Sequence, residues 1–387
     1  MNDQSTISRF SESRPREGTA RQLAATIDAE EWGDRFSAMH RQLYASEPAN
    51  FDDVMQCIYR PPDRYVLADH CLVRDAGKWH LYYITGLIDY AEEWIGHLRA
   101  GRFAEARQRP YESGDGHAIG PRLDQLQYRG MILDEAQGDF GIALQGTSNI
   151  VRINDEWVNV YTARGPQNVS LCLARSKDLL TWVPDSNNPF WRPPSWAASK
   201  GTCKNAHVIR YPGTDTHLIY YCVTLPDGCC AIAMISTIDF KHYSDHGPIV
   251  KMPHQLRGTQ GMESPCVVYR NGLWHLFFGC GEGVWHAVSP SPDQFMRGTQ
   301  HYTIVSTPGA YLFGRFHAVE VFEHEGKWYM TSTRKEYQRH LNRHAGVLKF
   351  RGSAEDEAVM LAGLFLAGID WKGDQPCLRR LKANEIP

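Results

Sequence analysis

The chain has 387 residues, of which 42% are hydrophobic and 22% are charged, and its formal net charge is -3. This composition is typical of a globular protein with a large core, and it offers no basic surface for nucleic acid. The polar N-terminus shows no secretory signal, and no later run is long enough to cross a bilayer. We therefore expect a cytoplasmic protein with neither a nucleic-acid nor a membrane partner.

The first predicted region is a helical or irregular arm over residues 1–60. Between Thr19 and Tyr44 apolar residues recur at mixed spacings of three and four, and the pattern ends near Pro48. Such an arm could mediate a homodimer or contact a small partner subunit. We assign residues 61–387 to a second region of short strands and turns.

Five segments of this second region share one layout. Each has a polar head, a short strand, a turn rich in Gly, Asn or Asp, and a second strand with aromatic residues. They begin at Ala68, Thr147, Lys204, Glu263 and Phe316. One such unit every 50 to 80 residues is typical of propeller blades. We predict an all-β fold, a five-bladed β-propeller, because the alternative two-sheet sandwich would not explain five similar heads.

Two further patterns fit the blades. Apolar strands followed by Ser and an Asp-containing turn, as at Ser176 and Ser236, fall where third and fourth strands should follow. One position of the second strand carries a tryptophan that we expect to pack between sheets, at Trp79, Trp157, Trp274 and Trp328. Other tryptophans could stack on a sugar, namely Trp191, Trp196 and Trp285.

The repeat is interrupted at about residues 87–146, which we interpret as an insertion after the first blade's opening hairpin. Residues 91–107 have a helical pattern, and a glycine-rich loop follows from Ser113 to Gly120. The helix could lie over the channel, where it would narrow the site or bind a partner subunit. It could equally pack on the outer wall of the propeller.

The heads of the repeats are the candidate functional residues, because the first strand of each propeller blade lines the central channel. The heads comprise Asp69 and His70, Ser148 and Asn149, Asn205 and His207, Glu263 and Ser264, and His317 with Glu320. Only Asp69 and Glu263 place an acid at the motif position itself. Two facing carboxylates can cleave a glycosidic bond, or can deprotonate an amine or alcohol. The alternative is that both accept hydrogen bonds from backbone amides at strand starts.

The sequence resembles the five-bladed propeller glycoside hydrolases of families 32, 43 and 117. Ala68-Asp69-His70-Cys71-Leu72 resembles their blade-one motif, and Met262-Glu263-Ser264-Pro265 is similar to their Glu-x-Pro segment. The resemblance covers roughly residues 65–333 and implies that Asp69 is the nucleophile or general base. It also implies that Glu263 is the general acid.

The resemblance breaks at two positions. The family carries a third carboxylate in blade three, where this chain has Asn205, and usually has Pro where this chain has His70. An amide cannot add the negative charge that helps to keep a nearby Glu protonated. His70, His207 and His317 could replace the missing acid, but their spacing matches no metal motif, and a hydrogen-bonded structural role is the alternative for each. We expect neither a metal nor another cofactor.

Three functions remain open. The first is a glycoside hydrolase-like enzyme that uses Asp69 and Glu263 on a small glycoside, with Ser148, Asn149, Asn205 and the three histidines binding the substrate. The second is a pseudoglycosidase that performs non-hydrolytic acid/base chemistry, such as intramolecular displacement in secondary-metabolite biosynthesis. The third is a non-catalytic propeller that serves as a binding scaffold. Because the outcome of hydrolysis depends on the carboxylate separation, the sequence leaves retention or inversion open.

Overall fold

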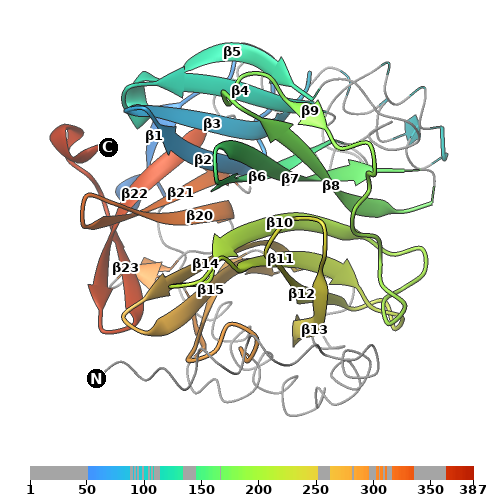
Figure 1. Cartoon of the computed structure of the whole chain (residues 1–387). Coiled ribbons are helices and arrows are strands. Elements are labelled where there is room, and N and C mark those ends of the chain that lie inside the picture. The colour runs from blue at the N-terminus through green and yellow to red at the C-terminus, as the bar shows by residue number, and fades with distance from the viewer. Residues whose placement is uncertain are drawn as a thin grey trace.

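A computed structural model describes residues 51–87, 114–133, 145–165, 167–251, 262–280, 283–295, 316–334 and 363–387, with short stretches in 90–108 and 302–311. Its strands form five antiparallel sheets around one axis, which is the predicted five-bladed β-propeller (Figure 1). The expected arm at 1–50 lies outside the described residues. No described helix is both long and apolar enough to span a membrane.

The first four blades follow the chain in order, each with its first strand innermost. Blade one contains β2 (His70–Asp75), β3 (Lys78–Thr85), β4 (Gly114–Gly120) and β5 (Gln127–Ile132). Blade two contains β6 (Gln145–Ile153), β7 (Glu156–Arg164), β8 (Val169–Ser176) and β9 (Val183–Pro184). Blade three contains β10 (Cys203–Arg210), β11 (His217–Thr224), β12 (Cys230–Thr237) and β13 (Ser244–Lys251). Blade four contains β14 (Glu263–Arg270), β15 (Leu273–Cys280), β16 (Gly283–Ser289) and β17 (Tyr302–Ile304).

Blade five joins the two ends of the described chain. It consists of β20 (Phe316–His324), β21 (Lys327–Arg334), β22 (Leu364–Lys372), β23 (Gln375–Arg379) and β1 (Gln56–Tyr59). Cys57 pairs with Phe365, and Asp370 pairs with Cys377, so β1 and β23 both hydrogen-bond to β22. The sequence analysis placed residues 56–59 in the arm, whereas they complete this sheet and tie the ring of blades together.

The remaining described elements are short. They are α4 (Phe51–Val54), η2 (Leu123–Gln125), η4 (Ala383–Glu385), and the paired β18 (Ser306–Thr307) and β19 (Ala310–Tyr311).

The expected insertion at 87–146 is smaller than predicted. Residues 114–120 and 127–132 are the third and fourth strands of blade one, and the glycine-rich loop is in fact the strand β4. Gly116 has to be small, because a Cβ there would lie 2.6 Å from the Tyr83 ring. Of the predicted helix, the few described residues include helical Glu93, His97 and Glu105, and most of it lies outside the described residues.

Five buried hydrophobic clusters each fill the space between neighbouring blades in the described structure. Leu218, Tyr220 and Cys222 face blade four, and the alternating Ile219, Tyr221 and Val223 face blade two. Both faces of an inner strand are therefore buried, which explains why these strands read as continuous apolar runs. The tryptophans of the repeat position pack as predicted, with Trp79, Trp157 and Trp274 buried and Trp328 partly buried.

The Asp-containing turns after the third strands cap their own backbones. In blade two, Ser176 Oγ accepts from the amide of Leu179, and Asp178 Oδ1 accepts from the next two amides. In blade three the capping hydroxyl belongs to Thr237, with Asp239 in the acidic position. Ser236, the serine of the repeated pattern in this blade, lies within hydrogen-bond distance of Nε2 of His246, at 2.8 Å.

The cysteines are free thiols, as expected, at the nine positions that the structure describes. Seven of them are buried, Cys57 is exposed and Cys230 is half-buried.

Candidate functional site

The first strands of blades two to five carry the same β-bulge at their heads. In each, one non-glycine residue adopts a positive φ, namely Thr147 (56°), Asn205 (55°), Ser264 (49°) and Ala318 (48°). The strand register shifts across each of these residues. A bulge re-aims side chains, and left-handed backbone at non-glycine residues is characteristic of functional sites. Here it turns the heads of blades three and four toward Asp69.

The Asp69 side chain contacts residues of three other blades. Its Oδ2 accepts hydrogen bonds from the Asn205 amide and, at 2.9 Å, from the Ser264 hydroxyl. Its Oδ1 lies 3.0 Å from Nε2 of His317. The residue is 6% exposed, and the backbone amide of Ile84 donates to its carbonyl oxygen. Blades one, three, four and five thus hold a single carboxylate at the channel.

The environment keeps Asp69 ionised. Burial alone would raise its pKa, but the hydrogen bond and charge of His317 act against burial, together with the Ser264 hydroxyl and the charge of Lys204. The balance lowers the pKa of Asp69 below its ordinary value. An ionised carboxylate can act as a base or a nucleophile.

Glu263 forms an ion pair with Lys204, which is the residue before Asn205. Lys204 Nζ lies 2.7 Å from Glu263 Oε1, and the two side chains are 33% and 19% exposed. Burial would lower the pKa of Lys204, but the charge and hydrogen bond of Glu263 outweigh it and raise that pKa. Lys204 and Asn205 are consecutive, so the dipeptide connects Glu263 to Asp69.

His70 lies apart from the Asp69 carboxylate and faces blade five. Its Nε2 is 2.7 Å from the Thr331 hydroxyl and 3.9 Å from Glu320 Oε2. Burial lowers the pKa of His70 to about 3 and raises the pKa of Glu320 to about 8, so both side chains are mainly neutral at pH 7.

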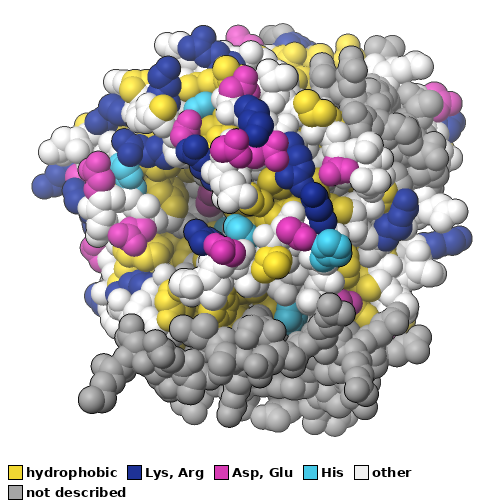
Figure 2. Space-filling model, viewed as in Figure 1, with side chains coloured by type: hydrophobic (Ala, Val, Ile, Leu, Met, Phe, Trp, Pro, Cys, Tyr) yellow, Lys and Arg dark blue, Asp and Glu magenta, His cyan; other side chains and the backbone are white. Residues whose placement is uncertain are grey.

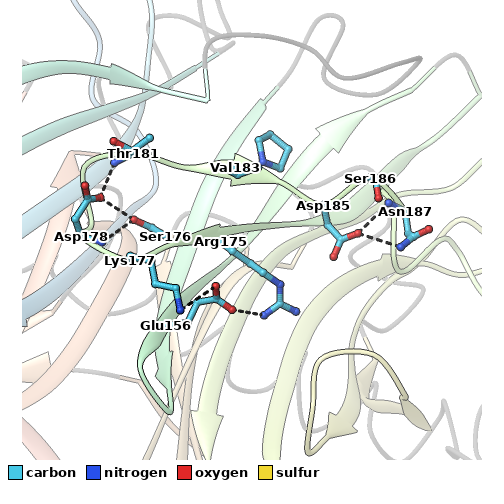
Figure 3. A pocket seen from close by; sticks show the side chains of 11 residues that line it. Glu156, Arg175, Ser176, Lys177, Asp178, Thr181, Val183, Asp185, Ser186 and Asn187 are labelled. Atoms are coloured by element: carbon cyan, nitrogen blue, oxygen red, sulfur yellow. Dashed lines mark hydrogen bonds and ion pairs between the residues drawn. The ribbon is translucent and has the colours of Figure 1, made fainter.

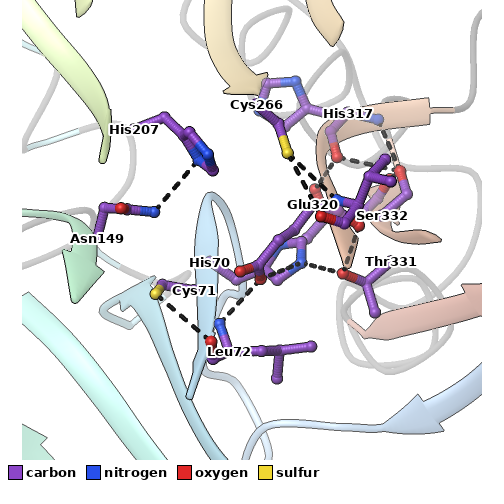
Figure 4. Close-up of polar contacts among 12 residues, drawn as sticks. His70, Cys71, Leu72, Asn149, His207, Cys266, His317, Glu320, Thr331 and Ser332 are labelled. Carbon is purple, nitrogen blue, oxygen red and sulfur yellow. Dashed lines mark hydrogen bonds and ion pairs between the residues drawn. The ribbon is translucent and has the colours of Figure 1, made fainter. Parts of the chain in front are cut away.

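A chain of hydrogen bonds links successive first strands around the channel, and Figure 4 shows the part of it between Glu320 and Leu72, beside the contact of Asn149 with His207. Asn149 Oδ1 accepts from the Val208 amide at 2.8 Å, and His207 Nε2 lies 3.0 Å from the Val267 carbonyl oxygen. Between blades four and five the Val321 amide donates to Cys266 Sγ, and between blades five and one the Leu72 amide donates to Glu320 Oε2. Asn149 and His207, expected to bind substrate, are therefore engaged in holding blades together.

Ser148 is similarly engaged between blades one and two. Its hydroxyl donates to Oδ2 of Asp115 on β4 and accepts from Asn159 Nδ2 at 2.7 Å. Asp115 is fully buried, and burial raises its pKa to about 7 despite the hydrogen bond from Ser148.

A cavity of about 30 Å³ adjoins these residues, which is about the volume of one water molecule. The structure thus brings most of the expected site residues around one small space. Its lining includes Asp69, His70, Ser148, Asn149, Asn205, His207, Ser264 and Glu320.

Among the residues at the channel mouth, sequence reasoning assigned no role to Lys204. A signal was available, because Lys204 stands immediately before the bulge residue of blade three, as Glu263 does in blade four. Equivalent positions on adjacent blades bring the two side chains together. Among the described residues no group of three or more His, Cys, Asp or Glu is placed to hold a metal ion.

The tryptophans suggested for sugar stacking belong to the core. Trp285 is fully buried and Trp196 is 5% exposed, with its Nε1 donating to Asp245 at 2.7 Å. Trp191 packs partly buried between blades two and three.

A larger hollow of about 570 Å³ lies at the outer edge of blade two (Figure 3). Its charged side chains pair with one another: Arg175 contacts Glu156 at 3.0 Å, and Lys177 lies 3.7 Å from the same carboxylate. Acidic and basic side chains are also interspersed over the described part of the face in Figure 2. We assign the candidate site to the channel, where charged groups converge from several blades.

Comparison with solved structures supports the fold. The chain is similar to the family 32 β-fructofuranosidase BmSUC1 of Bombyx mori, with 13% identity over 92% of this chain and 70% of that chain, at a TM-score of 0.58. It is also similar to a thermostable family-43 glycoside hydrolase, with 12% identity over 85% and 98% of the two chains, at a TM-score of 0.53. The β-xylosidase RS223 matches at 13% identity over 85% and 98%, with a TM-score of 0.54.

At the sequence level the chain matches no protein-family profile and no curated protein. The structural matches show that the fold is the five-bladed propeller of glycoside hydrolase families 32 and 43, so the chain is glycosidase-like in architecture.

Proposed function

We propose that the protein is a glycoside hydrolase-like enzyme that acts on a small glycoside or sugar-like metabolite through Asp69 and Glu263. The observation that carries this proposal is the Asp69 carboxylate, held ionised by residues of three other blades beside a water-sized cavity. Purely structural capping would not require polar contacts from three separate blades.

In this proposal Asp69 is the nucleophile or the base. It either attacks the anomeric carbon or deprotonates the water that does so, and its lowered pKa keeps it ready at neutral pH. Asn205 and Ser264 orient the carboxylate by fixing Oδ2. Asn205 stands where the resemblance implied a third carboxylate, and its side-chain amide donates a hydrogen bond to Asp69.

Glu263 is the proposed general acid, and it has to carry a proton to do this work. The ion pair with Lys204 at 2.7 Å favours the ionised form, so the acid is inactive while this pair is closed. Substrates whose leaving group is a good one would react without this proton.

The same ion pair favours a second candidate, a pseudoglycosidase that catalyses intramolecular displacement. Ring closure needs a base to deprotonate the attacking group, while the leaving group can depart unaided. Asp69 would supply the base, and an ionised Glu263 would be compatible with the reaction.

A panel of chromogenic furanosides and pyranosides tests the proposal against the wild-type protein, Asp69→Asn and Glu263→Gln. Hydrolysis should fall by about 10²- to 10⁴-fold in Asp69→Asn. Glu263→Gln should slow the hydrolysis of glycosides with poor leaving groups much more than that of nitrophenyl glycosides. Asp155→Asn, which changes an exposed surface acid, is the matched control. If no glycoside in the panel is turned over, the hydrolytic proposal fails, and a ring-closing activity that needs Asp69 but not Glu263 would establish the second candidate.

A further inference from the structure

Lys204 places an ammonium group at the mouth of the channel with donors to spare. It offers three N–H donors, and Glu263 takes one of them at 2.7 Å. Within the described part of the chain, Nζ has no other hydrogen-bond acceptor. The Lys204 side chain is 33% exposed, which leaves part of it open to solvent.

Lys204 is in contact with Glu263, and its charge also attracts the nearby Asp69 carboxylate. Cys222 lies directly opposite it on β11, and Asn205 follows it, so both of these neighbours are uncharged. Burial raises the pKa of Cys222 and that of the nearby Cys230, so both remain thiols. The Asp69 carboxylate is engaged by Asn205, Ser264 and His317. Glu263 is therefore the carboxylate that pairs with Lys204, and it is itself partly exposed.

A neutral sugar hydroxyl gains little from an ammonium group that is already paired. An anionic group gains more, because it adds a charge–charge attraction to the hydrogen bond, which a neutral hydroxyl cannot supply. Carboxylates and phosphates both accept several N–H bonds at once, so either could use the two open donors.

We propose that Lys204 binds an anionic group, a carboxylate or a phosphate, carried by the sugar-like substrate, and that this group displaces Glu263 from Lys204. The inference rests on the proposed function, because it names the substrate class of the same site. Glu263, once released, takes up a proton from solvent and donates it to the leaving oxygen, so the substrate itself switches on the acid.

The test measures binding of four probes by isothermal titration calorimetry: glucose 6-phosphate, glucuronate, uncharged glucose, and inorganic phosphate as a probe without a sugar ring. The wild-type protein should bind at least one anionic probe about tenfold or more tightly than glucose. The tighter of the two anionic sugars identifies a phosphate or a carboxylate as the group recognised.

Two variants should move this affinity in opposite directions. Lys204→Gln should weaken anion binding about tenfold or more, and Glu263→Gln should strengthen it, because it removes the competing carboxylate. Lys204→Arg keeps the charge and should retain binding, which covers the case in which Lys204→Gln does not fold. Lys177→Gln alters an exposed lysine that pairs with Asp155, and it should have no effect.

The inference is overturned if no anionic probe binds more tightly than glucose, or if neither Lys204→Gln nor Glu263→Gln changes anion binding. Lys204 and Glu263 would then form a structural ion pair between blades three and four. The two proposals fail separately: neutral glycosides hydrolysed in an Asp69-dependent way would uphold the enzyme without an anion site, whereas Lys204-dependent anion binding without any turnover would uphold the site alone.

Discussion

Nε2 of His317 lies 3.0 Å from Oδ1 of Asp69, so a side chain at the head of blade five controls the charge of a carboxylate at the head of blade one. Burial opposes ionisation of Asp69, and His317 contributes most to overcoming it. The relationship gives His317 a positioning role even if it never contacts substrate.

Replacing His317 with Ala should therefore raise the pKa of Asp69. The desolvation of the carboxylate remains, while its strongest stabilising partner is lost, so the pKa of Asp69 should rise. Carboxyl ¹³C titration of aspartate-labelled protein measures it. His242→Ala, at an exposed ion pair on blade three, is the control and should leave Asp69 unchanged. An unaltered Asp69 titration in His317→Ala would contradict the assigned role.

The five-bladed fold was predictable because its signal is repeated. Each blade places a polar head, a turn and an aromatic strand in the same order, so five weak patterns reinforce one another. The blade-one strands at Gly114–Gly120 and Gln127–Ile132 escaped notice because β4 contains three glycines and an aspartate, residue types that are depleted in strands. β1 was missed because its partner, β22, lies some 300 residues further along the chain.

The candidate site was predictable only as a set of positions. Asp69, Asn205 and His317 were expected at one channel, and the structure brings them into contact. The direction in which each side chain points depends on the bulges, which leave no residue-type signature, since the bulge residue is Thr, Asn, Ser or Ala. Sequence alone therefore could not separate the Asp69 cluster from Asn149 and His207, which bond the next blade.

The inter-blade bonds give a prediction of stability. Asn149→Ala leaves the buried Val208 amide without its acceptor, which should lower the free energy of unfolding by about 1 to 3 kcal/mol. Urea denaturation at pH 7.5 measures this change. Asn187→Ala removes an exposed amide that bonds only within its own turn, and it should alter stability by less than about 0.5 kcal/mol. Equal effects of the two substitutions would argue against a role for Asn149 in joining blades.

Two buried histidine pairs should make the protein sensitive to acid. His80 Nδ1 lies 3.2 Å from His117 Nε2, and His275 Nδ1 lies 3.0 Å from His286 Nε2. Burial lowers all four pKa values, to about 3 for His117 and about 4 for His275. These residues are neutral in the folded state, whereas in the unfolded state they take up protons below about pH 6.5.

Stability should therefore be complete above about pH 6.5 and fall as the pH drops from there toward 4, by up to about 1.4 kcal/mol per pH unit for each such histidine. Chemical unfolding at several pH values measures the slope. His286→Gln, which removes one of these protonation sites, should flatten it, and the exposed His242→Gln should not. A slope that His286→Gln leaves unchanged would show that acid acts elsewhere.

Asp115 should have the opposite effect at higher pH. Its folded pKa of about 7 lies above its ordinary value of 3.8, because the carboxyl group is buried between blades one and two. Stability from the neutral form is complete below about pH 4 and is lost as the pH rises toward 7, since the unfolded chain then ionises more readily. Asp115→Asn keeps an acceptor for the Ser148 hydroxyl but cannot ionise.

We expect Asp115→Asn to raise the free energy of unfolding at pH 8 by on the order of 2 kcal/mol, after allowance for an amide N–H that lacks a partner. At pH 4.5 the gain should shrink or reverse, because the wild-type carboxyl group is then neutral as well. Unfolding curves of both proteins at the two pH values measure this difference. Asp185→Asn, in an exposed turn, serves as the control. If Asp115→Asn raises the free energy of unfolding no more at pH 8 than at pH 4.5, Asp115 is ionised in the folded protein.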